Sequence, residues 1–98
     1  MAQYDVYLGD NGALWLDVQS DLISDLNTRI IVPLLPEVAA PKPAKRLNPV
    51  FAIDGKSYIC APQFLAAVPT TQIGAPVHNL SAASDQITAA LDMVFHGF

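Results

Sequence analysis

The segment from Ala82 to His96 constrains the fold most, because no residue in it breaks a helix. Ser81 suits the N-cap position, and Leu80 before it is placed to pack back onto the first turns. Apolar residues recur at the spacing of one buried stripe, at Ile87, Leu91, Val94, Phe95 and Phe98. The sequence therefore predicts an amphipathic helix near the carboxyl end.

A second set of residues shares the opposite face of this helix. Its members are spaced by four, three and four positions, at Asp85, Ala89, Asp92 and His96. Asp85 also lies in the first turn, where a carboxylate complements the helix dipole. We expect this face to point away from the protein core. The residues His96, Gly97 and Phe98 then form a tip that is presented to a partner.

Short strands precede the helix. Turn residues at 9–12 and the Asp54-Gly55 pair predict two hairpins. Strands are predicted over 4–8, 13–19, 29–35, 47–53, 56–61 and 66–73. The order of strands first and one helix last indicates an α+β fold, an antiparallel sheet with a C-terminal α-helix packed on it, in one domain over 1–98.

Three segments fit this pattern less simply. Pro33 lies inside an apolar strand, where it cannot donate to a ladder, so an edge position or a bulge is expected. The segment 20–28 predicts a loop with a helical turn, and 36–43, with Pro36, Pro41 and Pro43, predicts a loop or extended arm.

Composition limits the possible partners. Of the 98 residues, 52% are hydrophobic and only 14% are charged, which favours a homodimer that hides an apolar face over a tightly packed monomer. The net charge of −4 argues against direct binding of nucleic acid or of an anionic membrane. Lys42, Lys45 and Arg46 share one short segment, which is interpreted as a solvated loop or, less simply, as an interaction patch.

The motifs that the sequence contains or lacks predict the cellular location and the chemistry of the protein. The sequence shows no signal peptide, no apolar run of about 18 residues and a lone Cys60, so a cytoplasmic protein with a packed thiol is expected. We find no glycine-rich phosphate loop and no zinc-binding cysteine pair, and Asp92 with His96 is a surface pair more often than a metal site. We therefore expect no catalytic residues, no cofactor and no metal, although a Ser-His-Asp set assembled in space stays open.

The segment Asp17-Val18-Gln19-Ser20-Asp21 has two interpretations. Its polar side chains either hydrogen-bond a loop, with Ser20 or Asp21 capping a short turn, or form part of a polar interface. The sequence alone favours neither.

Five segments carry a family resemblance. They are Leu-Asp-Val-Gln-Ser-Asp-Leu-Ile at 16–23, Ile-Val-Pro-Leu at 31–34, Leu-Asn-Pro-Val at 47–50, Val-Pro at 68–69 with Ile-Gly at 73–74, and Met-Val-Phe-His-Gly-Phe at 93–98. In order, spacing and total length they resemble the CcdB toxin family, over nearly the whole chain. The first and last segments are the most specific.

The resemblance implies a function. CcdB-type toxins are cytoplasmic homodimers of toxin–antitoxin modules. Their fold, a small antiparallel barrel-like sheet with a C-terminal α-helix, is shared with a group of toxin endoribonucleases. CcdB-type toxins are not enzymes, but bind the A subunit of DNA gyrase and trap its cleaved complex with DNA. A CcdA-like antitoxin neutralises them, and operator DNA is bound only through that antitoxin. By position, the gyrase-binding residues would be Asp85, Ala89, Asp92, His96, Gly97, Phe98, Leu22 and Ile23.

The resemblance has departures that leave alternatives open. The family tip is Trp-Gly-Ile and its helix face carries asparagines, whereas this chain has His96 at the Trp position and Asp85, Ala89 and Asp92 on the face. Imidazole offers less stacking area than indole and, if protonated, would repel the gyrase arginine on which the Trp stacks. One alternative is a non-toxic dimer that binds the antitoxin as a decoy. Another is an endoribonuclease, for which Arg29 and Arg46 are the only arginines.

Overall fold

The computed structural model describes residues 1–10, 12–39, 42–44 and 46–97. Some residues of the predicted features lie outside the described residues. They are the turn residue Asn11, the loop residues Pro41 and Lys45, and the tip residue Phe98.

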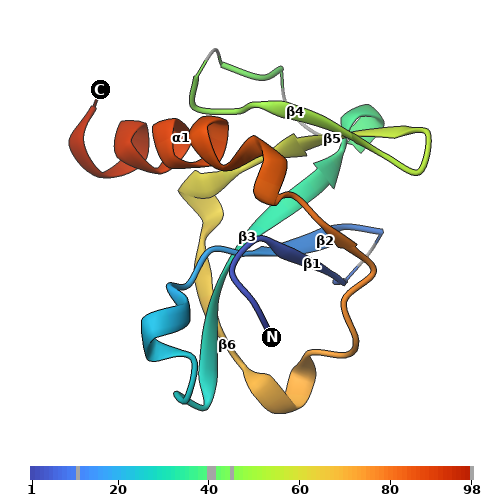
Figure 1. Ribbon diagram of the computed structural model, residues 1–98. Coiled ribbons are helices and arrows are strands. Elements are labelled where there is room, and N and C mark those ends of the chain that lie inside the picture. The colour runs from blue at the N-terminus through green and yellow to red at the C-terminus, as the bar shows by residue number, and fades with distance from the viewer. Residues whose placement is uncertain (11, 40–41, 45, 98) are drawn as a thin grey trace.

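Within these residues, seven strands pair into one antiparallel sheet (Figure 1). They are β1 (Asp5–Leu8), β2 (Leu14–Asp17), β3 (Thr28–Pro36), β4 (Val50–Ile53), β5 (Lys56–Cys60), β6 (Ala66–Pro69) and β7 (His78–Asn79). The order across the sheet is β4-β5-β3-β2-β1-β7, and β6 pairs with β3 beside β5. The sheet curls strongly and is nearly closed, which confirms the predicted α+β, barrel-like fold class.

The central strand β3 explains how the sheet accommodates Pro33. One side of β3 pairs with β2, and the other pairs first with β6, up to Ile31, and then with β5, from Leu34. The Pro33 carbonyl accepts from the Ala61 N–H at 3.0 Å, on the β5 and β6 side. The N and C=O of one strand residue point the same way, so the missing N–H falls where β3 changes partner. The predicted edge position or bulge was wrong, and a partner change replaces it.

The helix α1 (Ser84–His96) lies across one face of the sheet (Figure 1). Its side chains Ile87 and Ala90 are fully buried, and Leu91 and Val94 are half-buried. Ile87 joins the larger core cluster with residues of β1 to β5, including Val6, Leu16, Val32, Leu34 and Phe51. Burying a side chain of this size contributes roughly 1.5–3 kcal/mol, so α1 is held mainly by its apolar stripe.

The opposite side of the sheet holds a smaller cluster. Tyr7, Ile31, Val68 and Ile73 are buried there, and the Trp15 ring packs against them. The two strands of the first hairpin therefore contribute side chains to the packing on both faces of the sheet.

Several boundaries differ from the prediction. Ser81 is not the N-cap of α1, because residues Ser81–Ala83 form a 3₁₀ turn (η5) and α1 begins only at Ser84. The Asn79 Oδ1 accepts from the Ser81 N–H at 2.8 Å, at the start of this turn. The two-residue strand β7 was not predicted, since its length carries no periodic signal.

Five of the six predicted strands are shorter in the structure, among them 47–53 and 66–73. The expected strand 47–53 begins at Val50, because the buried Asn48 side chain donates to the Cys60 carbonyl at 3.0 Å and Pro49 has no N–H. The expected strand 66–73 ends at Pro69 and continues as the 3₁₀ turn η4 (Thr70–Gln72). The Asp54-Gly55 hairpin is confirmed, with φ values of 52° and 79° that suit its tight turn.

Candidate partner-binding site

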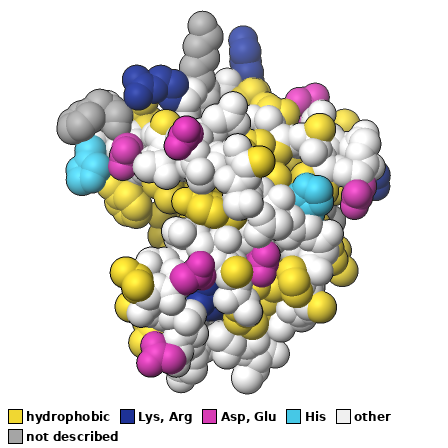
Figure 2. Space-filling model, in the orientation of Figure 1, with side chains coloured by type: hydrophobic (Ala, Val, Ile, Leu, Met, Phe, Trp, Pro, Cys, Tyr) yellow, Lys and Arg dark blue, Asp and Glu magenta, His cyan; other side chains and the backbone are white. Residues whose placement is uncertain are grey.

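The outward face of α1 carries the helical residues that the sequence singled out. Asp85, Asp92 and His96 are exposed, and Ala89 between them is half-buried. Figure 2 shows acidic side chains along the surface of α1 and a band of hydrophobic side chains along its lower border. The structure thus places Asp85, Ala89, Asp92 and His96 along one strip on the outward surface of α1. The role of this strip in binding stays a prediction.

Gly97 shapes the end of this strip. It adopts a left-handed conformation with φ 79°, and its N–H donates to the Met93 carbonyl at 3.0 Å. Glycine adopts this conformation without steric cost and commonly terminates helices in this way. The chain therefore turns away from the helix axis directly after His96.

Phe95 does not lie on the buried stripe as predicted. Its side chain is 62% exposed. At ~100° per residue, Phe95 is rotated by roughly 80° from Ile87, which places it at the border of the apolar face. The sheet does not extend far enough to cover that border. Phe64, in the neighbouring 3₁₀ turn η3 (Pro62–Phe64), is likewise 56% exposed.

The other two predicted contact residues lie on the 3₁₀ turn η1 (Asp21–Ile23). Leu22 is 94% exposed and Ile23 is 44% exposed. This turn, which follows β2, lies well below α1 in Figure 1. In one chain, the helix face and the η1 tip are therefore two separate surfaces.

The polar side chains of the segment 17–21 are used for hydrogen bonds within the protein. Asp17 and Gln19 are both buried, so they are not part of an exposed polar interface. Ser20 caps η1, because its Oγ accepts from the Leu22 N–H at 3.2 Å. Of the two interpretations, loop hydrogen bonding with Ser20 as the cap is the one that the structure shows.

Sequence reasoning missed the partner of Asp17. The Arg29 Nε donates to the Asp17 Oδ2 at 2.7 Å, and both side chains are fully buried. The two terminal guanidinium nitrogens of Arg29 are buried without a hydrogen-bond partner among the described residues. The only sequence signal was a charged residue beginning an apolar strand. Next to this pair, burial and the nearby Asp5 carboxylate raise the pKa of Tyr7 to about 12.

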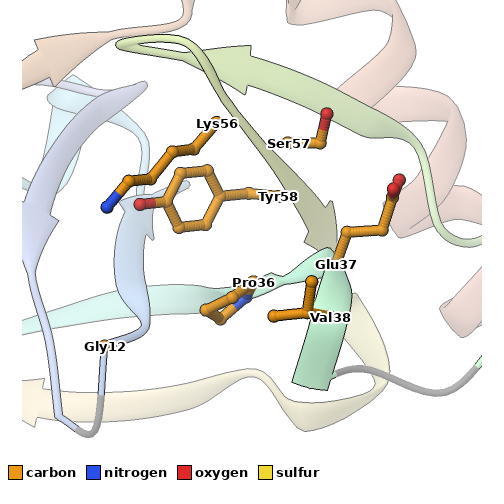
Figure 3. Close-up of a pocket in the computed structure, with 7 residues that line it drawn as sticks. All are labelled: Gly12, Pro36, Glu37, Val38, Lys56, Ser57 and Tyr58. Atoms are coloured by element: carbon orange, nitrogen blue, oxygen red, sulfur yellow. The ribbon is translucent and has the colours of Figure 1, made fainter.

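A pocket of about 520 Å³ lies at another place on the surface (Figure 3). Its lining comes from the turn after β1, the end of β3 with the 3₁₀ turn η2 (Glu37–Ala39), and β5. Pro36, Val38 and the Tyr58 ring form apolar walls, while Lys56 and Glu37 bring charges of opposite sign. None of the lining residues was predicted, and no arginine is among them.

An endoribonuclease would need an arginine beside a hydroxyl or an acid in one groove, and neither arginine of this chain lines the pocket. Arg29 is buried against Asp17, whereas Arg46 is exposed with a φ of 63° in the segment before β4. Cys60 is buried, and burial raises its thiol pKa to about 12. The prediction of a packed thiol is thus confirmed, because the reactive thiolate is strongly disfavoured there.

Two further findings concern the described part of the chain. No helix in it is long and apolar enough to cross a bilayer. It also contains no cluster of three or more histidine, cysteine, aspartate or glutamate residues suited to hold a metal ion.

Comparison with known proteins places the chain in a family. The family model described as CcdB protein matches residues 3–97, which is nearly the whole chain. The protein belongs to the CcdB family. The resemblance that the segments at 16–23 and 93–98 carry is thereby confirmed for this family member.

Solved structures share the fold of this CcdB family member at low sequence identity. An endoribonuclease in complex with its cognate antitoxin, from a mycobacterial species, is 15% identical with a TM-score of 0.76, and the match covers 97% of this chain and 94% of that one. An endoribonuclease from a mycobacterial species is 14% identical with a TM-score of 0.78, and the match covers 97% and 90%. These matches establish the common fold.

Proposed function

We propose that this CcdB family member is the toxin of a toxin–antitoxin module and that it binds the A subunit of DNA gyrase, trapping the cleaved gyrase–DNA complex. The observation that carries the proposal is the strip on α1. All four helical positions that match the family's binding face lie on the outward side, with Asp85, Asp92 and His96 exposed. The exposed Leu22 and Ile23 on η1 supply the apolar part of the contact.

The proposed contact between the toxin and the gyrase A subunit depends on complementary shape and charge, and it forms no covalent bond. The carboxylates of Asp85 and Asp92 attract a basic surface on gyrase, and the His96 ring stacks on a guanidinium group. The left-handed turn at Gly97 keeps the helix end open for close approach. In this mechanism the toxin has no catalytic residue and needs no cofactor.

The proposal includes a homodimer and an antitoxin. Exposed aromatic side chains at Phe64 and Phe95 are apolar surface of the kind that dimer interfaces bury. A homodimer would present two copies of the helix strip and two copies of the η1 tip to its partner. A structural neighbour named as an endoribonuclease is in complex with its cognate antitoxin, which supports a CcdA-like antitoxin as partner. Operator DNA would be bound through that antitoxin.

Direct titration of the gyrase A subunit tests the binding site. We expect His96→Ala to weaken binding by roughly five- to thirtyfold, because losing a central stacking residue costs about 1–2 kcal/mol. Gln86→Ala, an exposed position on α1 away from the strip, is the matched control and should bind as the unmodified protein does. Equal affinity of the His96→Ala variant would remove the strip from the contact.

An endoribonuclease is the second candidate, favoured by the neighbours' fold and by the pocket of Figure 3. The lining of that pocket includes Lys56, Ser57, Tyr58 and Glu37, and the Lys56 amine and the Tyr58 hydroxyl, which are groups able to move protons, lie side by side. Among the described lining residues there is no arginine, and Lys56 is the one cation available to stabilise a phosphate. We expect no cleavage of messenger RNA by the purified protein. Cleavage that is lost in Lys56→Ala would establish this candidate instead.

The decoy alternative differs from the proposed toxin in that it does not bind gyrase. A dimer that binds antitoxin but not gyrase would leave growth unchanged when expressed without antitoxin, whereas the proposed toxin arrests growth.

A further inference from the structure

The turn η1 carries two large apolar side chains that are exposed to solvent. None of its three residues is buried, although Leu22 and Ile23 are both hydrophobic. A short turn of this kind is normally mobile, because it lacks the packing that orders loops. Its conformation must therefore be fixed by polar contacts.

The Gln19 side chain supplies the contact that joins η1 to the sheet. It is only 3% exposed. Its Nε2 donates to the Ile23 carbonyl at the end of η1, at 2.9 Å. Its Oε1 accepts from the Ile30 N–H in β3, at 3.1 Å. One side chain thus bridges the end of the turn and the central strand.

The backbone of Gln19 is itself fixed by a buried hydrogen bond. Its backbone N–H donates to the Asp17 Oδ1 at 3.0 Å, and the other oxygen of Asp17 accepts from the Arg29 Nε at 2.7 Å. The start of η1 is tied separately, because the Asp21 carboxylate accepts from the Gln3 N–H at 2.8 Å. Both oxygens of Asp17 and both polar atoms of the Gln19 side chain have partners in this network, which favours one arrangement of the groups that they connect. The two terminal nitrogens of Arg29 have no partner among the described residues.

We propose that Gln19 is a positioning residue, which fixes the η1 tip so that Leu22 and Ile23 are presented to the partner in one conformation. The proposal deepens the proposed function and rests on it for the identity of that partner. Gln19 makes no contact with the partner itself, since it is buried beneath the turn. Its contribution is to lower the ordering cost of binding.

The first experiment measures the free protein. In Gln19→Met, which keeps an unbranched side chain but loses both hydrogen bonds, ¹⁵N relaxation should give order parameters for Leu22 and Ile23 below about 0.6, against about 0.85 for rigid backbone. Ile53→Val, which removes a buried methyl group in β4 far along the sheet, is the matched control and should leave η1 rigid. An η1 that stays rigid in Gln19→Met would overturn the proposal.

The second experiment measures binding to the gyrase A subunit. Gln19→Met should weaken binding about tenfold, and it should have no further effect in a Leu22→Ala/Ile23→Ala background. A merely destabilising role would weaken binding equally in both backgrounds, which would also overturn the proposal. If the unmodified protein does not bind gyrase, the proposed function fails, while the order parameters alone decide whether Gln19 positions the tip.

Discussion

Asp17→Ala is expected to lower the free energy of unfolding by about 3–5 kcal/mol, because it leaves the Arg29 guanidinium buried without its carboxylate partner. Two terminal nitrogens of Arg29 already lack a described partner, so the Nε contact is the one that compensates the charge. A domain of this size has a total stability of roughly 5–15 kcal/mol, so the loss is a large part of it. Urea unfolding at 25 °C measures the change.

The matched control is Asp25→Ala, which removes an exposed carboxylate from the loop after η1 and should change stability by less than about 0.5 kcal/mol. The double variant Asp17→Leu/Arg29→Met should be more stable than Asp17→Ala, because no charge then remains buried alone. A loss below about 1 kcal/mol in Asp17→Ala would show that the buried pair does not support the fold as argued.

Asp92→Arg is expected to abolish binding to the gyrase A subunit, with a loss of roughly a hundredfold or more. The residue is exposed on the outward face of α1, between Ala89 and His96. If this strip meets a basic surface, reversing its charge places like charges together, which costs several kcal/mol. The helix itself should stay folded, because the side chain takes no part in the core.

Glu37→Arg is the control for this experiment, since it makes the same change of charge at an exposed position in η2. Affinity should be measured by titration at two salt concentrations, and the melting temperature of each variant should be measured alongside. Full affinity of Asp92→Arg, with unchanged stability, would mean that gyrase does not contact this face.

Local signals in the sequence predicted the parts of the fold that depend on neighbouring residues. The Asp54-Gly55 pair predicted its hairpin, and the spacing of Ile87, Leu91 and Val94 predicted the inner face of the helix. Phe95 was assigned wrongly, because periodicity gives the direction of a side chain but not the extent of the surface beneath it. The strand β7 was missed because two residues are too few for a pattern.

In the candidate site, too, some features could be predicted from the sequence and others could not. Exposure of Asp85, Asp92 and His96 followed from helical geometry alone. The burial of Asp17 and Gln19 could not be predicted, because it depends on Arg29, which is brought to them by strand pairing. Gyrase as the partner comes from the family resemblance and not from the geometry of any residue.

The most direct measurement is a cleavage assay with purified protein, DNA gyrase and supercoiled plasmid. At micromolar protein we predict that denaturation of gyrase yields linear DNA, which reports trapped cleavage complexes, and that Asp92→Arg yields none. Plasmid that stays free of double-strand breaks with the unmodified protein at the same concentration would contradict the proposed function.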